Sequence, residues 1–220
     1  MKQVKCGLLF LLSLVCAAGC SNVFSSSLAP WAARDPADLI PDVDAGNVRE
    51  LAELAEDDPG LSLELLKRIR DAAAGASSPD KAKLRAAGLP AAANASELGG
   101  AILRNLRGTG DLDADHIQDL INSALNDAGN LLSAAAVLED LLGTDPAADP
   151  SFAAASSAGD LAMAAVIFLA AEAKQSGTST FIESYTPVPG SLIYKLALAA
   201  YGKPDVSGSI KDIIEGLRLV

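Results

Sequence analysis

The sequence has 220 residues, of which 50% are hydrophobic and only 4% aromatic, and its formal net charge is −11 at pH 7. A chain this negative does not attract nucleic acid or anionic lipid headgroups through a general electrostatic field, so nucleic-acid binding is excluded as its function. Alanine is abundant, and long alternating runs of β-branched and aromatic residues are absent, so the composition predicts an all-α fold with closely packed helices.

The first 19 residues have the three parts of a secretory signal peptide. Lys2 and Lys5 supply positive charge, a mostly apolar run of nine residues follows at 7–15, and small residues occupy 17–19. A membrane-spanning helix needs about 20 apolar residues. This run is therefore too short to cross a bilayer, and it predicts a signal peptide over residues 1–19 that is removed.

Residues 17–20, Ala-Ala-Gly-Cys, resemble the lipobox of bacterial lipoproteins, although leucine is commonest at the position of Ala17. The resemblance implies a diacylglyceryl group on the sulfur of Cys20 and cleavage just before this residue. It also implies acylation of the new N-terminus by a fatty acid such as palmitate. For many bacteria with two membranes, Ser21 in place of aspartate implies an outer-membrane lipoprotein that faces the periplasm. The alternative is an ordinary signal peptide that leaves Cys20 as a free thiol.

The chain after the signal peptide divides into a tether and a helical domain. Serines at 25–27 and several prolines oppose regular helix, so residues 20–45 are predicted to be the lipidated cysteine and a flexible tether. Residues 46–220 are predicted to form a single helical domain. Without residues 1–19 the chain keeps 201 residues, and the loss of two lysines changes its formal charge from −11 to −13.

Apolar residues at helical spacing predict about nine helices in the domain. Asn47 with Glu50 predicts a capping box at the first helix, and Pro79 and Pro90 each mark the first turn of a later helix. The first two helices are expected to form an αα-hairpin. The expected helices cover residues 47–57, 62–74, 78–88, 90–106, 111–128, 131–142, 151–175, 191–201 and 207–217.

The helix expected at 151–175 differs from the others because it contains eleven residues, Leu161 to Ala171, without a polar side chain. This run is bracketed by Asp160 and Glu172 and is too short to span a bilayer. A helix that is apolar on most sides is typical of the centre of a bundle.

Helix pairs are expected to begin near Asn47, Pro79 and Asp113, at spacings of 32 and 34 residues. This spacing resembles that of tetratricopeptide-like helical-hairpin lipoproteins, some of which accompany periplasmic solute transporters. The tetratricopeptide consensus is not met, because Lys67 falls where alanine is expected. Two architectures therefore remain open, an irregular helical bundle and a degenerate helical-hairpin array.

The sequence contains no set of residues typical of catalysis. Nucleophile-elbow, phosphate-loop, dinucleotide and zinc-protease motifs are absent. His116 is the only histidine, and the acidic run that begins at Asp111 lacks the glycine and the final glutamate of a calcium loop. We therefore expect a protein that is not an enzyme and has no metal or cofactor.

Four aromatic side chains near the C-terminus are candidates for contact with a partner: Phe181, Tyr185, Tyr194 and Tyr201. Tyr194 and Tyr201 lie on one face of a helix, where burial in the core is the alternative. The expected function is that of a lipid-anchored scaffold that binds a protein partner at the cell envelope. Two alternatives are a lipoprotein that binds a small apolar ligand between its helices, and an accessory component of a periplasmic solute transporter.

Overall fold

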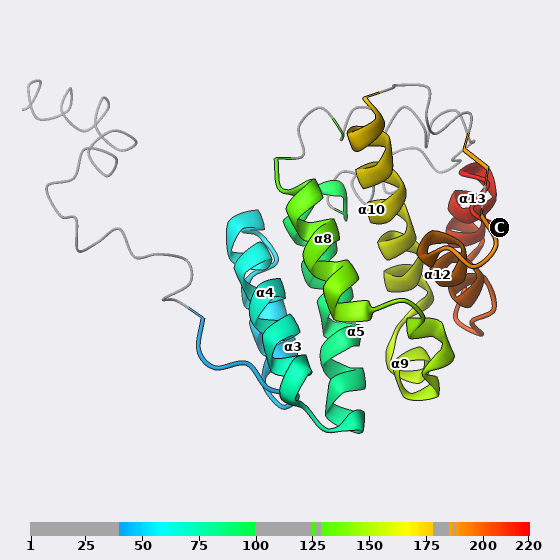
Figure 1. Cartoon of the computed structure of the whole chain (residues 1–220). Helices are drawn as coiled ribbons and strands as arrows, with labels where there is room; N and C mark the ends of the chain where they lie inside the picture. The colour runs from blue at the N-terminus through cyan, green and yellow to red at the C-terminus, as the bar shows by residue number, and fades with distance from the viewer. Residues whose placement is uncertain (1–39, 100–124, 126–128, 178–184, 187) are drawn as a thin grey trace, which may run out of the picture. The chain divides into compact units, whose positions relative to one another are not determined.

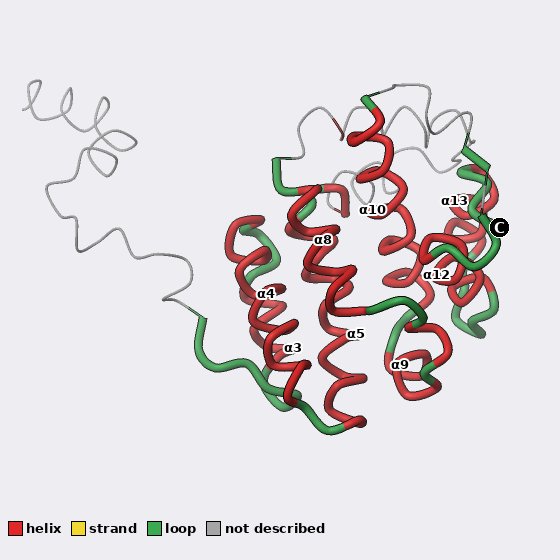
Figure 2. The backbone as a smooth tube through the Cα atoms, in the orientation of Figure 1, coloured by secondary structure: helices red, strands yellow, loops and turns green. Residues whose placement is uncertain are grey.

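The computed structural model describes residues 40–99, 125, 129–177, 185, 186 and 188–220, and all regular structure in this part of the chain is helical (Figures 1 and 2). The predicted all-α fold class is confirmed. The described helices are α3 (Val48–Leu54), α4 (Pro59–Gly75), α5 (Ser78–Ala95), α8 (Leu131–Leu142), the 3₁₀ helix η2 (Pro146–Ala148), α9 (Pro150–Ala155), α10 (Ala158–Ser176), α12 (Leu192–Tyr201) and α13 (Gly208–Gly216).

The compact helical unit begins at Ile40, before the expected end of the tether at residue 45. Ile40 is only 7% exposed and belongs to the hydrophobic core. The expected capping box at Asn47 does not form. The Asn47 side chain accepts a hydrogen bond from the Asp44 backbone N–H at 2.9 Å and donates one to the Asp42 carbonyl at 2.8 Å. Asn47 therefore fixes the segment before α3 instead of capping this helix.

Helices α4 and α5 form a hairpin, with only residues 76 and 77 between them. Helix α3 contacts both α4 and α5, so the expected pairing of residues 47–57 with 62–74 contributes less to the packing of α4 than its contact with α5 does. Asp58 caps α4 by accepting from the backbone N–H of Leu61 at 3.0 Å, and Pro59 occupies the first turn. This Asp-Pro pair starts the helix three residues earlier than expected.

Helix α5 continues through Pro90, where the sequence predicted a boundary between two helices. Proline removes one backbone hydrogen bond and disfavours a helix interior by about 3 kcal/mol. Burial on both sides of the proline offsets this cost, because Gly88, Leu89, Ala91 and Ala92 are all in the core. Gly88 also permits close packing, since a Cβ atom at this position would overlap Cδ2 of Leu141 on α8.

A break separates α9 from α10, although one helix was expected over residues 151–175. Ser156 has an extended backbone, with φ −93° and ψ 145°. The next residue, Ser157, caps α10 by accepting from the Asp160 N–H at 3.1 Å, and its hydroxyl donates to the Asp160 carboxylate at 2.7 Å. Two polar side chains thus start a new helix inside a run of good helix formers.

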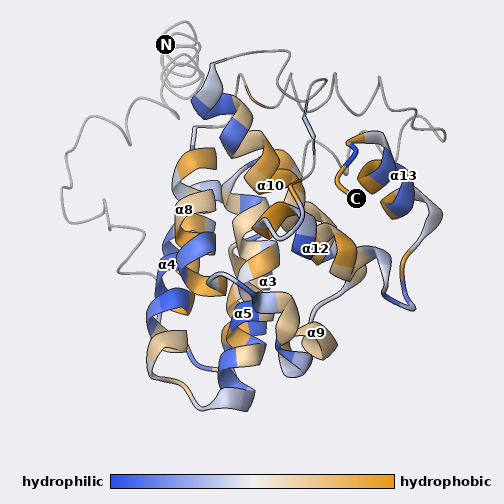
Figure 3. Cartoon of the chain, turned by 45° about the vertical axis from the view of Figure 1, so that its right-hand side comes forward, coloured by the Kyte–Doolittle hydropathy of each residue, from blue (hydrophilic) through white to orange (hydrophobic). Residues whose placement is uncertain are grey.

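Helix α10 is the central helix of the bundle and packs against α5, α8, α12 and α13. Figure 3 shows hydrophobic residues along most of α10 and hydrophilic ones at its C-terminal end. All of residues 161–171 except Met163 are buried, which confirms the expected central position. Gly177 ends the helix with a left-handed φ of 68°. None of the described helices is both long and apolar enough to cross a membrane.

In the described part of the chain the helices form a bundle, and the boundary that the repeat places at Pro90 is absent, because residues 78–95 form one helix. The remainder of the second expected unit lies outside the described residues. The third expected start, Asp113, lies outside the described residues.

Candidate functional site

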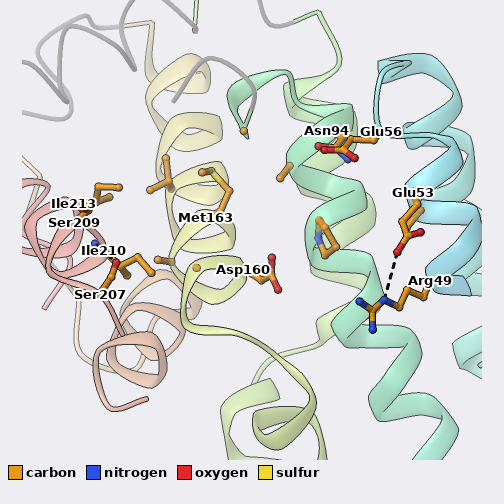
Figure 4. A pocket seen from close by; sticks show the side chains of 17 residues that line it. Arg49, Glu53, Glu56, Asn94, Asp160, Met163, Ser207, Ser209, Ile210 and Ile213 are labelled. Carbon is orange, nitrogen blue, oxygen red and sulfur yellow. Dashed lines mark hydrogen bonds and ion pairs between the residues drawn. The ribbon is translucent and has the colours of Figure 1, made fainter. Parts of the chain in front are cut away.

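A pocket of about 630 Å³ lies between α3, α5, α10 and α13 (Figure 4). Its volume falls within the range of about 300–1,000 Å³ that small-molecule sites occupy. Side chains from four separate helices and from the loops next to them converge on it. The residues that line the pocket are Arg49, Ala52, Glu53, Glu56, Pro90, Ala93, Asn94, Gly99, Gly159, Asp160, Ala162, Met163, Val166, Ser207, Ser209, Ile210 and Ile213.

Small residues create the space of this pocket. Ala52, Ala93 and Ala162 come from three different helices, and Gly99 and Gly159 carry no side chain at all. Alanine allows helices to form readily but fills little volume between them. At Gly159 the nearest neighbour of an added Cβ would be Cδ1 of Ile210, at 3.7 Å. The alanine-rich composition thus has a local consequence, a hollow where larger side chains would close the core.

Longer apolar side chains cover one side of the pocket. Met163 and Val166 come from α10, and Ile210 and Ile213 come from α13. Figure 4 shows Met163 projecting from α10, and Ile210 and Ile213 on α13. Ile213 is 6% exposed and Val166 is 1% exposed, so this side is continuous with the hydrophobic core. Methionine adapts its shape to different neighbours, which suits a surface that accommodates an apolar ligand.

Charged and polar side chains occupy the rim. The Nε of Arg49 lies 3.5 Å from Oε1 of Glu53, and both side chains are largely exposed (Figure 4). Glu56, in the turn after α3, and Asp160, at the start of α10, complete the acidic groups. Ser207 uses its hydroxyl to cap α13 by accepting from the Ile210 N–H at 3.3 Å. The pocket therefore combines an apolar interior with a predominantly acidic mouth.

The chemistry of the lining is suited to binding. The lining residues include neither histidine nor cysteine, and the hydroxyl of Ser207 already serves the helix end. A nucleophile paired with a base, the usual sign of covalent catalysis, is not formed by the residues of this pocket. In the described part of the chain, no three or more acidic, histidine or cysteine side chains are close enough together to hold a metal ion.

A second hollow of about 590 Å³ lies beside the segment that precedes α3. Its lining includes three carboxylates, from Asp44, Asp71 and Asp80, and few large apolar side chains. Asp44 is occupied by local hydrogen bonds to the backbone N–H groups of Gly46 and Asn47, at 2.6 and 3.0 Å. The first pocket is therefore the stronger candidate for ligand binding.

The three tyrosines among the aromatic residues proposed from the sequence do not form one exposed surface. Tyr185 is only 9% exposed and packs in the hydrophobic core. Burial raises the pKa of its hydroxyl, and the carboxylate of Glu172 raises it further, while a hydrogen bond with Ser191 lowers it. Burial likewise raises the pKa of Glu172, with a smaller contribution from Glu139. The expected partner contact at Tyr185 is thus replaced by a core position.

Tyr194 is half-buried, and Tyr201 is 36% exposed at the end of α12. The Tyr201 hydroxyl donates to Oε1 of Glu215 at 2.9 Å, and Nζ of Lys211 lies 5.3 Å from the centre of its ring. The hydrogen bond to Glu215, followed by the negative charge of this residue, raises the pKa of Tyr201. Tyr201 therefore joins α12 to α13.

Four residues singled out in the sequence lie outside the described part of the chain: Cys20, Phe181, Asp111 and His116.

The chain matches no known protein family, no curated protein and no solved structure.

Proposed function

We propose that this protein is a non-catalytic, lipid-anchored protein of the bacterial cell envelope that binds a small, largely apolar ligand in the pocket between α3, α5, α10 and α13. The pocket is the observation that carries the proposal. Its volume of about 630 Å³ is that of a ligand site, and four helices supply its lining. The lipobox-like residues 17–20 support attachment through Cys20, with the outer membrane and its periplasmic face as the proposed location.

The lining supports ligand binding more strongly than it supports a purely structural role. A core of this kind normally leaves few voids larger than a water molecule, because side chains interdigitate closely. Here Ala52, Ala93 and Ala162 leave space, while Met163 and Ile210 present apolar surface to it. An apolar body that filled this space would bury surface that is now in contact with water, which favours binding.

A titration with a neutral naphthylamine dye tests this function. The full chain is placed in vesicles of neutral phospholipid, because detergent molecules are amphipathic and would compete for an apolar pocket. We expect saturable binding of one dye molecule. Ala52→Trp is expected to lower the affinity by about tenfold or more, since the indole fills part of the cavity. Ala52 is half-buried in the short helix α3, so this substitution does not overfill the core.

Ala74→Trp is the matched control, because Ala74 is exposed on α4 and outside the lining. This control is expected to bind the dye as the unaltered chain does. Circular dichroism spectra of both variants establish that the helices are retained. Equal dye binding by the two tryptophan variants and the unaltered chain would overturn the proposed pocket function.

Protein binding is a second candidate function, favoured by exposed apolar side chains on α12. Leu198 is 50% exposed and lies one turn before Tyr201 on the same helix. Aromatic and aliphatic side chains in such positions contribute to protein interfaces. Crosslinking from this face in intact cells, with Leu198→Lys as the control, distinguishes a specific partner from chance contacts.

A further inference from the structure

The mouth of the pocket has an excess of negative charge. Among the lining residues three carry carboxylates, Glu53, Glu56 and Asp160, and one carries a base, Arg49. The charge of Arg49 is already compensated by Glu53, whose Oε1 lies 3.5 Å from its Nε. In the described part of the chain neither Glu56 nor Asp160 forms an ion pair with a base. These two carboxylates therefore remain to interact with whatever enters the pocket.

From this charge distribution we infer that the pocket selects amphipathic cations, molecules with an apolar body and an ammonium or guanidinium head. The inference rests on the proposed function and names the class of ligand. The apolar body would contact Met163, Val166 and Ile213, and the positive head would lie at the rim near Glu56 and Asp160. Figure 4 shows Asp160 directed into the space between α10 and α5, with Glu56 on the opposite side of the mouth.

The two carboxylates do not contribute equally. Asp160 lies at the N-terminus of α10, where the helix dipole stabilises negative charge, and its carboxylate accepts a hydrogen bond from the Ser157 hydroxyl at 2.7 Å. The structure describes no such partner for Glu56. We therefore assign the larger share of the attraction for a cation to Glu56.

The same charges act against anionic amphiphiles such as fatty acids. A carboxylate head at the rim would meet Glu56 and Asp160, and the only lining base is engaged with Glu53. The formal net charge of −11 adds a long-range field of the same sign. The lining has no aromatic ring, so a cation is attracted by charge alone, without a cation–π contribution. Selectivity of this origin weakens as the salt concentration rises.

Three probes with the same chain test the inference: octylammonium, octanol and octanoate. Each displaces the naphthylamine dye from the full chain in neutral vesicles, and the Ala52→Trp variant in the same vesicles supplies the blank. We expect octylammonium to bind about tenfold more tightly than octanoate at low salt, with octanol between them, because exposed charges interact only modestly in water. The ratio is expected to approach one in about 1 M salt.

Glu56→Gln is expected to reduce the preference for octylammonium over octanoate about threefold. Glu50→Gln is the matched control, because it removes the same charge from an exposed residue of α3 that does not line the pocket. This control is expected to leave the preference for octylammonium over octanoate nearly unchanged. Equal effects of the two substitutions would overturn the assignment of selectivity to the rim.

Equal affinities of the three probes for the unaltered chain would overturn the inference and leave the proposed pocket function intact. Tighter binding of octanoate would do the same. Failure of all three probes and of the dye to bind above the Ala52→Trp blank would instead overturn the pocket function itself.

Discussion

Cys20→Ser is expected to abolish the incorporation of radioactive palmitate into the protein. The resemblance of residues 17–20 to a lipobox assigns the acylated thioether to this sulfur, and a serine hydroxyl does not replace it. Each buried methylene contributes about 0.8 kcal/mol to membrane attachment, and two or more acyl chains are needed for a stable anchor. We therefore expect the loss of membrane-attachment free energy in Cys20→Ser to be the largest effect of any single substitution in this protein.

Cys16→Ser is the matched control, because Cys16 lies within the segment that is predicted to be removed. This variant is expected to be labelled like the unaltered chain, and the labelled protein should remain with membranes washed in high salt. Absence of label from the unaltered protein would contradict the proposed anchor. So would label that persists in Cys20→Ser.

Phe152→Ala is expected to lower the free energy of unfolding by about 3–5 kcal/mol. Phe152 is 0% exposed and is the largest fully buried side chain in the described part of the sequence. It belongs to α9, a helix of only six residues that packs against α5. A helix this short has little stability of its own, so it depends on the packing of its one large side chain. Urea denaturation followed by circular dichroism measures the effect.

Leu198→Ala provides the comparison for this prediction. Leu198 is 50% exposed, so the same kind of truncation removes far less buried surface and is expected to cost less than about 1 kcal/mol. Phe152→Leu is expected to retain a substantial part of the stability, because leucine fills part of the ring's volume. A loss of less than about 1 kcal/mol in Phe152→Ala would show that α9 does not hold this core together.

Helical periodicity predicted the elements whose ends carry strong local signals. The bounds of α8, Leu131–Leu142, coincide with the prediction, because Gly129 and Gly143 flank a strongly apolar run. The last two helices begin one residue after their expected starts, since Ser191 and Ser207 are their capping residues. The central position of α10 also followed from its sequence, since only a surrounded helix is apolar on most sides.

The sequence-based prediction differs from the structure where tertiary packing competes with a local signal, or where a short capping signal lies within an alanine-rich run. Pro90 is a helix boundary in most sequences, but burial of its neighbours keeps α5 continuous. Helical periodicity does not predict the break at Ser156 because alanines surround it, although Ser157 followed by Asp160 has the spacing of a capping pair. Asp58-Pro59 marks the start of α4 by a proline in the first turn, and the same signal at Pro79 correctly placed the start of α5.

The pocket was only partly foreseeable. The sequence allows a small apolar ligand between the helices, but it does not say which alanines line a common space. Ala52, Ala93 and Ala162 line one pocket only because α5 packs against both α3 and α10, through contacts between residues far apart in the chain. Tyr185 was expected at a surface for a partner, but this aromatic residue next to a proline-rich turn is buried in the core.

Native mass spectrometry of the full chain, released from cell envelopes in detergent-free membrane particles, tests the ligand-binding proposal most directly. We predict a population whose mass exceeds that of the lipidated chain by one small molecule, and the same population should be lost from Ala52→Trp and kept in Ala74→Trp. A mass equal to that of the lipidated chain alone in all three proteins would contradict the account, because the pocket would then hold no ligand in the cell.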